Sequence, residues 1–301
     1  MNIKHVIESQ QFSREDLEGL FALATSLEGK RTKDLDGKIM AALFYEPSTR
    51  TRLSFESAME RLGGNVISTE NAKEFSSAAK GETLEDTIRM MHHYADAIVL
   101  RHYEKGASER ASKVSSVPII NAGDGAGQHP TQGLLDLYTI QRELGSIDEA
   151  HVTMVGDLKN GRTVRSLSYL LGKYKDVTVS FVAPEALRIG DDIKEYLSAH
   201  NATFTETDNL ESVLSISDVI YMTRVQKERF QDPEEYERLK GSYIFTREMA
   251  DRMKESSIIM HPLPRVDEIQ PEVDDSPHAA YFKQASYGVL VRMALLKTLL
   301  G

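Results

Sequence analysis

The stretch KIMAALFYEPSTRTRLSFESAMERLG, residues 38–63, carries the pattern that decides the fold. Its apolar beginning predicts a buried strand over residues 38–46, because a short apolar run bounded by turn residues is typical of a strand covered on both faces. Apolar residues then recur three and four positions apart, which predicts a helix over residues 51–63. Two hydroxyl side chains and the run Arg-Thr-Arg lie where the strand pattern gives way to the helix pattern.

The same alternation of strand and helix patterns continues along the chain. Helix patterns cover residues 82–95, 108–115 and 131–144, and an apolar helix pattern covers residues 287–300. The further strand patterns lie at 65–70, 96–102, 117–123, 151–157, 176–184, 202–207, 218–224 and 257–264. Because alternating strands and helices favour parallel sheets covered on both faces, the predicted fold class is α/β with two doubly wound domains.

The composition narrows the class of protein. A chain of 301 residues is long enough for about two domains, and 41% hydrophobic residues allow a sizeable core. The formal net charge of -10 argues against a nucleic-acid or membrane partner, which usually requires a basic face. No cysteine is present, which excludes disulfides and thiolate metal sites and favours a reducing, cytoplasmic location. No apolar run is long enough to span a bilayer.

Unusual polar residues recur at the ends of the predicted strands, where open α/β sheets bind ligands. Six such groups point to one active site in a cleft between the two domains. They are residues 46–52, Arg101 with His102, Gln128 with His129, residues 157–163, residues 224–226 and the motif HPLPR at 261–265.

The junction at Ser48–Arg52 has the chemistry of an anion site. Ser48 and Thr49 can cap the helix, whose first turn offers unpaired N–H groups and the positive end of the helix dipole. Arg50 adds a planar guanidinium that suits phosphate geometry. Taken alone, these residues would equally fit a capped helix with two solvated arginines.

Other motifs are less specific. The segment GDGAGQHPTQG, residues 123–133, has the spacing G-x-G-x-G rather than the dinucleotide spacing G-x-G-x-x-G, and a glycine turn before a helix explains it. A nucleotide-binding oxidoreductase is therefore a weak alternative. No spacing of His, Asp and Glu predicts a metal site, and no cofactor is expected.

Several motifs occur together in the order of a known family: STRTR, HPTQ (129–132), DLKNGRT (157–163), TRVQKER (223–229) and HPLPR. From about residue 3 onward the chain resembles the catalytic chains of the aspartate carbamoyltransferases, which join carbamoyl phosphate to L-aspartate in pyrimidine biosynthesis. STRTR and HPTQ are shared by all carbamoyltransferases. HPLPR, TRVQKER and the loop of Lys80 single out the aspartate enzymes, since ornithine enzymes carry a cysteine in the motif HCLP.

The resemblance implies a carbamoyl-phosphate domain at 1–130, an aspartate domain at 131–284 and a last helix, 285–301, that packs back on the first domain. It implies that Thr51, Arg101 and His129 surround the carbonyl oxygen on which negative charge develops. The residues implied to bind carbamoyl phosphate are Ser48, Thr49, Arg50, Thr51, Arg101, His129, Gln132, Ser76 and the carbonyls of Pro262 and Leu263. Those implied to bind aspartate are Lys80, Arg162, Thr163, Arg224 and Gln226.

The resemblance also implies how the site closes and assembles. Glu46 would pair with Arg162 and Arg229 when the domains close, and Ser76 and Lys80 would come from a neighbouring subunit of a homotrimer. Asn160 stands where allosteric members carry an aromatic residue, so association with separate regulatory chains stays open.

Two alternatives to aspartate carbamoylation stay open as well. The chain could be a carbamoyltransferase for another amino acid, against which HPLPR, Lys80 and Arg224 weigh. It could also be a non-catalytic scaffold of the same fold, although Arg50, Arg101 and His129 are all present.

Overall fold

The chain forms two compact units. The computed structural model describes residues 3–75, 77–225 and 232–301. The first unit comprises Met1–Leu135 with Ser286–Gly301, and the second comprises Asp136–Ala285. The division falls inside two helices, α6 (Pro130–Leu144) and α11 (Tyr281–Leu300). The functional boundaries at residues 130 and 284 stay predictions.

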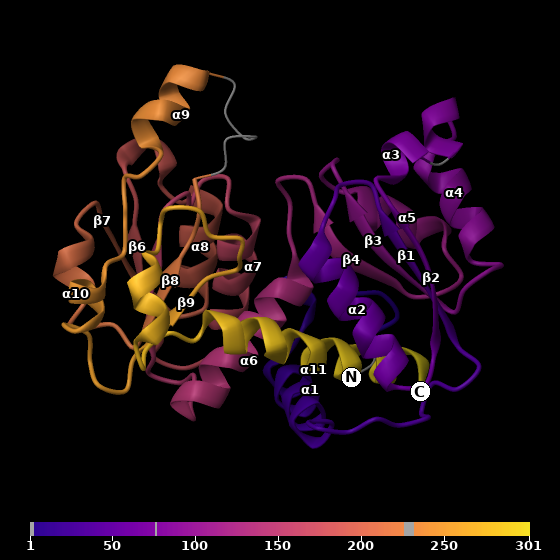
Figure 1. Cartoon of the computed structure of the whole chain (residues 1–301), viewed down its shortest axis with the longest axis horizontal. Helices are drawn as coiled ribbons and strands as arrows, with labels where there is room; N and C mark the ends of the chain where they lie inside the picture. The colour runs from indigo at the N-terminus through magenta and orange to yellow at the C-terminus, as the bar shows by residue number, and fades with distance from the viewer. Residues whose placement is uncertain (1–2, 76, 226–231) are drawn as a thin grey trace. The chain divides into compact units, whose positions relative to one another are not determined.

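The first unit contains a parallel four-stranded sheet in the order β2-β1-β3-β4 (Figure 1). Its strands are β1 (Ile39–Phe44), β2 (Asn65–Glu70), β3 (Ala97–His102) and β4 (Ile119–Asp124). The chain passes from β1 to β2 on one side and then to β3 on the other side of β1. The order therefore reverses between β1 and β3, and such a switch point is where open α/β sheets bind ligands.

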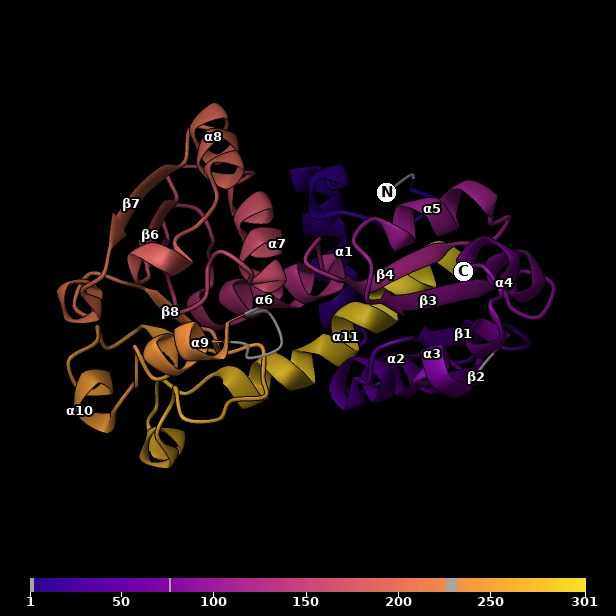
Figure 2. The same cartoon turned by 90° about the horizontal axis from the view of Figure 1, so that it is seen from above.

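Helices cover both faces of this sheet. Because parallel crossovers are right-handed, the reversal sends α2 to one face and α4 and α5 to the other, as Figure 2 shows. Ala41, Leu43, Ile98 and Leu100 form part of the core on the face of α4 and α5. The helical segments of the unit are η1 (Ser9–Gln11), α1 (Arg14–Ser26), α2 (Thr49–Arg61), α3 (Ala72–Phe75), η2 (Ser77–Lys80), α4 (Leu84–Met91) and α5 (Ala107–Val114).

The second unit contains a parallel five-stranded sheet in the order β7-β6-β5-β8-β9. Its strands are β5 (His151–Val155), β6 (Thr178–Val182), β7 (Thr203–Thr207), β8 (Val219–Met222) and β9 (Ile258–Met260). The order reverses between β5 and β8, so this unit also has a switch point. Val155, Ile220, Met222 and Ile259 belong to one continuous apolar core.

The remaining helical segments are α7 (Arg162–Leu171), η3 (Glu185–Leu187), α8 (Asp191–Ala199), η4 (Leu210–Val213), α9 (Pro233–Leu239), α10 (Arg247–Ala250) and η6 (Pro271–Asp275).

The prediction of two doubly wound α/β domains with parallel sheets is confirmed. Each strand pattern corresponds to one of the strands β1–β9, although most strands are shorter than predicted. The helix predicted over 82–95 ends at Met91, and the one predicted over 51–63 begins at Thr49. Within the described residues, no helix has the length and apolar character needed to cross a membrane.

Candidate active site

In the first unit, the junction between β1 and α2 has the predicted form. Thr49, Arg50 and Thr51 are the first residues of α2, and Ser48 is at the N-cap. The Ser48 hydroxyl, however, makes no capping hydrogen bond, so the predicted capping role is wrong at that side chain. The first-turn N–H groups are thus not taken up by this hydroxyl, which suits a helix start that binds an external anion.

The two arginines of the junction differ in their surroundings. Arg52 contacts two carboxylates, Glu56 at 3.0 Å and Glu70 at 3.2 Å, and the Ser48 N–H donates to Glu70 at 3.3 Å. The positive charge of Arg52 is therefore balanced within the unit. Arg50 is exposed at the start of the helix. The prediction that Arg50 binds a phosphate stays a prediction.

Arg101 lies beside this junction because β3 is the neighbour of β1. It is paired in register with Phe44, and its carbonyl accepts a hydrogen bond from the Tyr45 N–H at 2.9 Å. Its Nε lies 3.7 Å from Glu46 Oε2, and both side chains are partly buried. Glu46 thus forms an ion pair with Arg101 of its own unit. The predicted pairing of Glu46 with residues of the aspartate domain stays a prediction.

The loop after β4 brings His129 to the same edge of the sheet. Asp124 holds this loop, because its carboxylate accepts the N–H groups of Gln128 and Gly106, each at 2.9 Å. Gly125 has φ +51°, and a Cβ there would lie 2.5 Å from the Tyr103 carbonyl oxygen, so the turn requires glycine. The glycines are therefore explained by the turn.

His129 and Gln132 lie on either side of the start of α6. Both are buried, at 4% and 8% exposure. The Thr131 hydroxyl lies 3.3 Å from His129 Nδ1. A donor role for His129 requires the tautomer in which this hydroxyl donates to Nδ1 and the proton is on Nε2.

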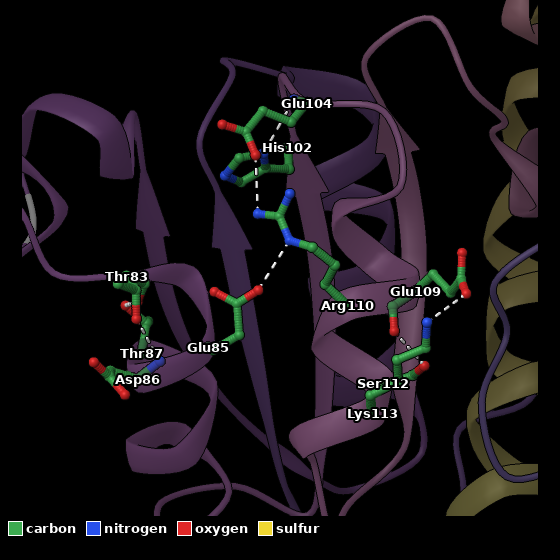
Figure 3. A network of polar contacts seen from close by, with 10 residues as sticks. All are labelled: Thr83, Glu85, Asp86, Thr87, His102, Glu104, Glu109, Arg110, Ser112 and Lys113. Carbon is green, nitrogen blue, oxygen red and sulfur yellow. Dashed lines mark hydrogen bonds and ion pairs between the residues drawn. The ribbon is translucent and has the colours of Figure 1, made fainter.

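The segment that contains Lys80 leads into α4, and a charged network anchors the start of α4 (Figure 3). Arg110 on α5 contacts Glu85 on α4 and Glu104 after β3, each at 2.9 Å. The Glu104 N–H donates to His102 Nδ1, which fixes the chain just beyond Arg101. Lys80 itself is exposed at the end of η2, and Ser76 lies outside the described residues.

In the second unit, Arg162 and Thr163 are the first residues of α7, directly after β5. The preceding loop is closed by Asp157, whose carboxylate accepts the Asn160 N–H at 3.0 Å and contacts its side-chain amide at 3.2 Å. Gly156 has φ +114°, and a Cβ would lie 2.4 Å from the Thr223 carbonyl oxygen. The absence of a side chain at Gly156 thus allows the chain after β5 to lie close to the chain after β8.

Arg224 follows β8, the neighbour of β5, and is partly buried. Burial and, to a smaller extent, the positive charge of Arg224 lower the pKa of His261, which follows the next strand, β9. Arg162, Arg224 and the turn of Pro262 and Leu263 thus follow three consecutive strands of one sheet. Gln226 and Arg229 lie outside the described residues.

The sequence prediction missed the groups that support these residues. Asp124 and Thr131 support His129, and a buried pair, Asp136 and Tyr221, joins the second sheet to α6 through a 2.7 Å hydrogen bond. Asp136 interrupts the apolar run LLDLYTI, and a lone carboxylate in such a run is a signal that could have found it. No three acidic or histidine side chains of the described ranges are grouped so that they could hold a metal ion.

Both units therefore place arginines at the switch point of a parallel sheet, and the first adds a helix start suited to phosphate. These features define a two-unit α/β protein with a site for anionic ligands at the switch point of each sheet. Family models agree: residues 4–142 match the aspartate/ornithine carbamoyltransferase carbamoyl-P binding domain, and residues 148–299 match the Asp/Orn binding domain. The chain belongs to the aspartate/ornithine carbamoyltransferase family.

Named relatives and solved structures are similar along nearly the whole chain. Aspartate carbamoyltransferase 3 of Pisum sativum, a chloroplastic protein, is 56% identical over 98% of this chain and 77% of its own length. The aspartate transcarbamoylase catalytic subunit of Methanocaldococcus jannaschii is 54% identical, with a TM-score of 0.91 over 99% of this chain and 98% of that chain. The Trypanosoma cruzi enzyme, in complex with carbamoyl phosphate and aspartate, is 43% identical, with a TM-score of 0.94 over 99% of this chain and 97% of that chain.

Proposed function

We propose that this chain transfers the carbamoyl group of carbamoyl phosphate to the amino group of L-aspartate, as a step of pyrimidine biosynthesis. The amine nitrogen forms a bond to the carbonyl carbon, and the bond from that carbon to the phosphate oxygen breaks. The products are N-carbamoyl-L-aspartate and phosphate, which accepts the proton of the amine. No cofactor is needed for this exchange.

The observation that carries the proposal is the pair of arginines at the second switch point. Arg162 and Arg224 follow the neighbouring strands β5 and β8. A dianionic acceptor such as aspartate is attracted by two cations, whereas the cationic side chain of ornithine is repelled. Relatives at 53–56% identity carry the name aspartate carbamoyltransferase. The Trypanosoma cruzi enzyme has been solved with carbamoyl aspartate and phosphate, the two products proposed here.

In this proposal the first unit binds the phosphate and stabilises the transition state. Ser48, Thr49 and Arg50 hold the phosphate at the start of α2. Thr51, Arg101 and His129 donate to the carbonyl oxygen when it becomes an oxyanion. Each such donor typically contributes about 3–4 kcal/mol to the transition state. The reaction then depends on orientation and electrostatic stabilisation rather than on a side-chain general base.

The proposal extends to assembly. We infer a homotrimer in which Lys80 and Ser76 complete the site of a neighbouring subunit, with separate regulatory chains as a further partner. Lys80 is exposed at the end of η2, which suits a residue that serves another chain. Sedimentation of the purified chain tests this assembly, and a monomer with full activity would contradict it. For the compartment we propose the cytoplasm, which fractionation of the source cells tests.

The reaction itself is tested by supplying carbamoyl phosphate with either L-aspartate or L-ornithine and measuring the ureido product. We expect turnover with aspartate alone, and its loss in Arg162→Ala and Arg224→Ala. Turnover with ornithine would mean that the acceptor is wrong. A correctly folded assembly that is inactive with both would favour the scaffold alternative.

A further inference from the structure

The turn after β9 holds a residue in an uncommon backbone conformation. Leu263 has φ +52°, a left-handed value that is costly for a branched side chain. Its N–H donates to Nδ1 of His261 at 2.7 Å. In a trans peptide the N–H and the C=O point in opposite directions. The hydrogen bond into the His261 ring therefore aims the carbonyl of Pro262 away from the ring.

The His261 ring is held in one protonation state. Because Nδ1 accepts a hydrogen bond, the proton lies on Nε2, which is 2.7 Å from Glu268 Oε1. The second carboxylate oxygen of Glu268 accepts the N–H groups of Val266 at 3.0 Å and Asp267 at 3.1 Å. Burial lowers the pKa of His261, although the nearby carboxylate of Glu268 opposes this shift. The lowered pKa keeps the ring neutral, so that Nδ1 can accept a hydrogen bond. The contact is therefore a hydrogen bond from a neutral ring to a carboxylate.

A buried chain of hydrogen bonds leads from the backbone of His261 to the start of α7. The backbone N–H of His261 donates to the side-chain oxygen of Gln284 at 2.9 Å, and the Gln284 side-chain amide donates to Asp136 at 2.6 Å. The Tyr221 hydroxyl donates to the other oxygen of Asp136 at 2.7 Å and also bonds the Thr163 side chain. His261, Gln284, Asp136 and Tyr221 are at most 1% exposed. One internal support therefore reaches both the turn after β9 and the helix that begins with Arg162.

We propose that His261, held by Glu268, is a positioning residue for the carbamoyl group. It fixes the Pro262–Leu263 peptide so that the backbone carbonyl of Pro262 accepts the carbamoyl NH2. Specificity for a carbamoyl over an acetyl group then depends on a ring that does not touch the substrate. This inference rests on the proposed function, because it takes carbamoyl phosphate as the ligand of the turn.

Two amide substitutions separate the roles of the two ring nitrogens. In His261→Asn, the side-chain oxygen can take the place of Nδ1 and accept the Leu263 N–H, as in a common Asx turn. In His261→Gln, the longer amide can reach Glu268 but leaves the Leu263 N–H without its acceptor. His278→Asn is the control for general destabilisation, since His278 is buried in the same unit and bonds the Ser257 carbonyl instead.

The readout is the ratio of the dissociation constants of acetyl phosphate and carbamoyl phosphate, with inorganic phosphate as a reference ligand. The two acyl phosphates differ by a methyl group in place of the NH2. We expect His261→Gln to lower the preference for carbamoyl phosphate about tenfold, the worth of one hydrogen bond, and to leave phosphate affinity unchanged. We expect His261→Asn and His278→Asn to keep the preference within about threefold.

Either of two results would overturn the positioning role: an unchanged preference in His261→Gln, or a loss in a folded His261→Asn as large as that in His261→Gln. If His261→Gln does not fold, His261→Ala takes its place, since alanine also leaves the Leu263 N–H without its acceptor. A preference that is lost in His261→Ala and kept in His261→Asn supports the role, and an unchanged preference in His261→Ala overturns it. Carbamoyl aspartate formation by the unsubstituted chain is measured in parallel. Its absence would count against the proposed function, whereas normal turnover without a change in preference would count against the positioning role alone.

Discussion

The two switch points support their site residues in different ways. In the first unit, the groups around Arg50 lie on a partly exposed helix start, and the neighbouring charges of Arg52 and Arg101 are balanced by Glu56, Glu70 and Glu46. In the second unit, a buried hydrogen-bond chain lies beneath the helix start and the turn after β9. Helix-start N–H groups need little support, because the helix itself orients them. Backbone carbonyls in an irregular turn are not oriented by a regular element, so hydrogen bonds from side chains must fix their direction.

We expect the largest effect on stability when the buried hydrogen-bond chain of the second unit is broken. Asp136→Ala removes the acceptor of both the Tyr221 hydroxyl and the Gln284 amide, which are fully buried. Because a buried donor left without a partner costs about 1–3 kcal/mol, we expect the free energy of unfolding to fall by about 3 kcal/mol. Urea unfolding measures it.

The matched control is a charged network of the first unit. Arg110→Ala breaks the contacts with Glu85 and Glu104 shown in Figure 3, where all three side chains are substantially exposed. Such pairs contribute about 0–1 kcal/mol, so the loss should be clearly smaller than in Asp136→Ala. Equal losses in the two variants would contradict the contrast between the units.

A smaller effect concerns pH and involves one histidine from each unit. Burial lowers the pKa of both His102 and His261 from the ordinary value of 6.5. Below that value the unfolded chain binds more protons than the native chain, so the free energy of unfolding decreases as the pH falls. This stability is present above pH 6.5 and is lost as the pH falls through the native pKa values.

Urea unfolding between about pH 7.5 and about pH 5.5 checks the direction. We expect His261→Asn to reduce the slope without abolishing it, because His102 still contributes, as do His5 and His151, whose pKa values are also lowered by burial. Glu268 adds nothing in this range, because its pKa, lowered by the His261 hydrogen bond against the opposing effect of burial, lies below 4.5. Stability that rises on acidification would contradict the lowered pKa values of these histidines.

Much of the fold could be predicted from the sequence because its signals are local. The apolar run before Glu46 and the helical spacing after it identify β1 and α2 without any tertiary information. The same local reading found Arg101 at the end of β3 and His129 before α6. What it could not find are contacts between distant residues. Asp136 and Gln284 lie far apart in the chain, and no spacing rule predicts the bond between them. The unused Ser48 hydroxyl shows the same limit, since capping depends on a rotamer that the sequence does not determine.

The central claim is that the first unit binds the phosphate of carbamoyl phosphate and the second unit binds aspartate. Initial-rate kinetics with each substrate varied separately test it most directly, with Arg50→Ala and Arg224→Ala as variants and Arg61→Ala, at the far end of α2, as the control. We predict that Arg50→Ala raises the KM for carbamoyl phosphate about 10- to 100-fold and that Arg224→Ala does the same for aspartate, the worth of one charged hydrogen bond in each case. Arg61→Ala should change neither constant. If both variants raise the same constant, or each raises the opposite one, the division of substrates between the two sheets is wrong.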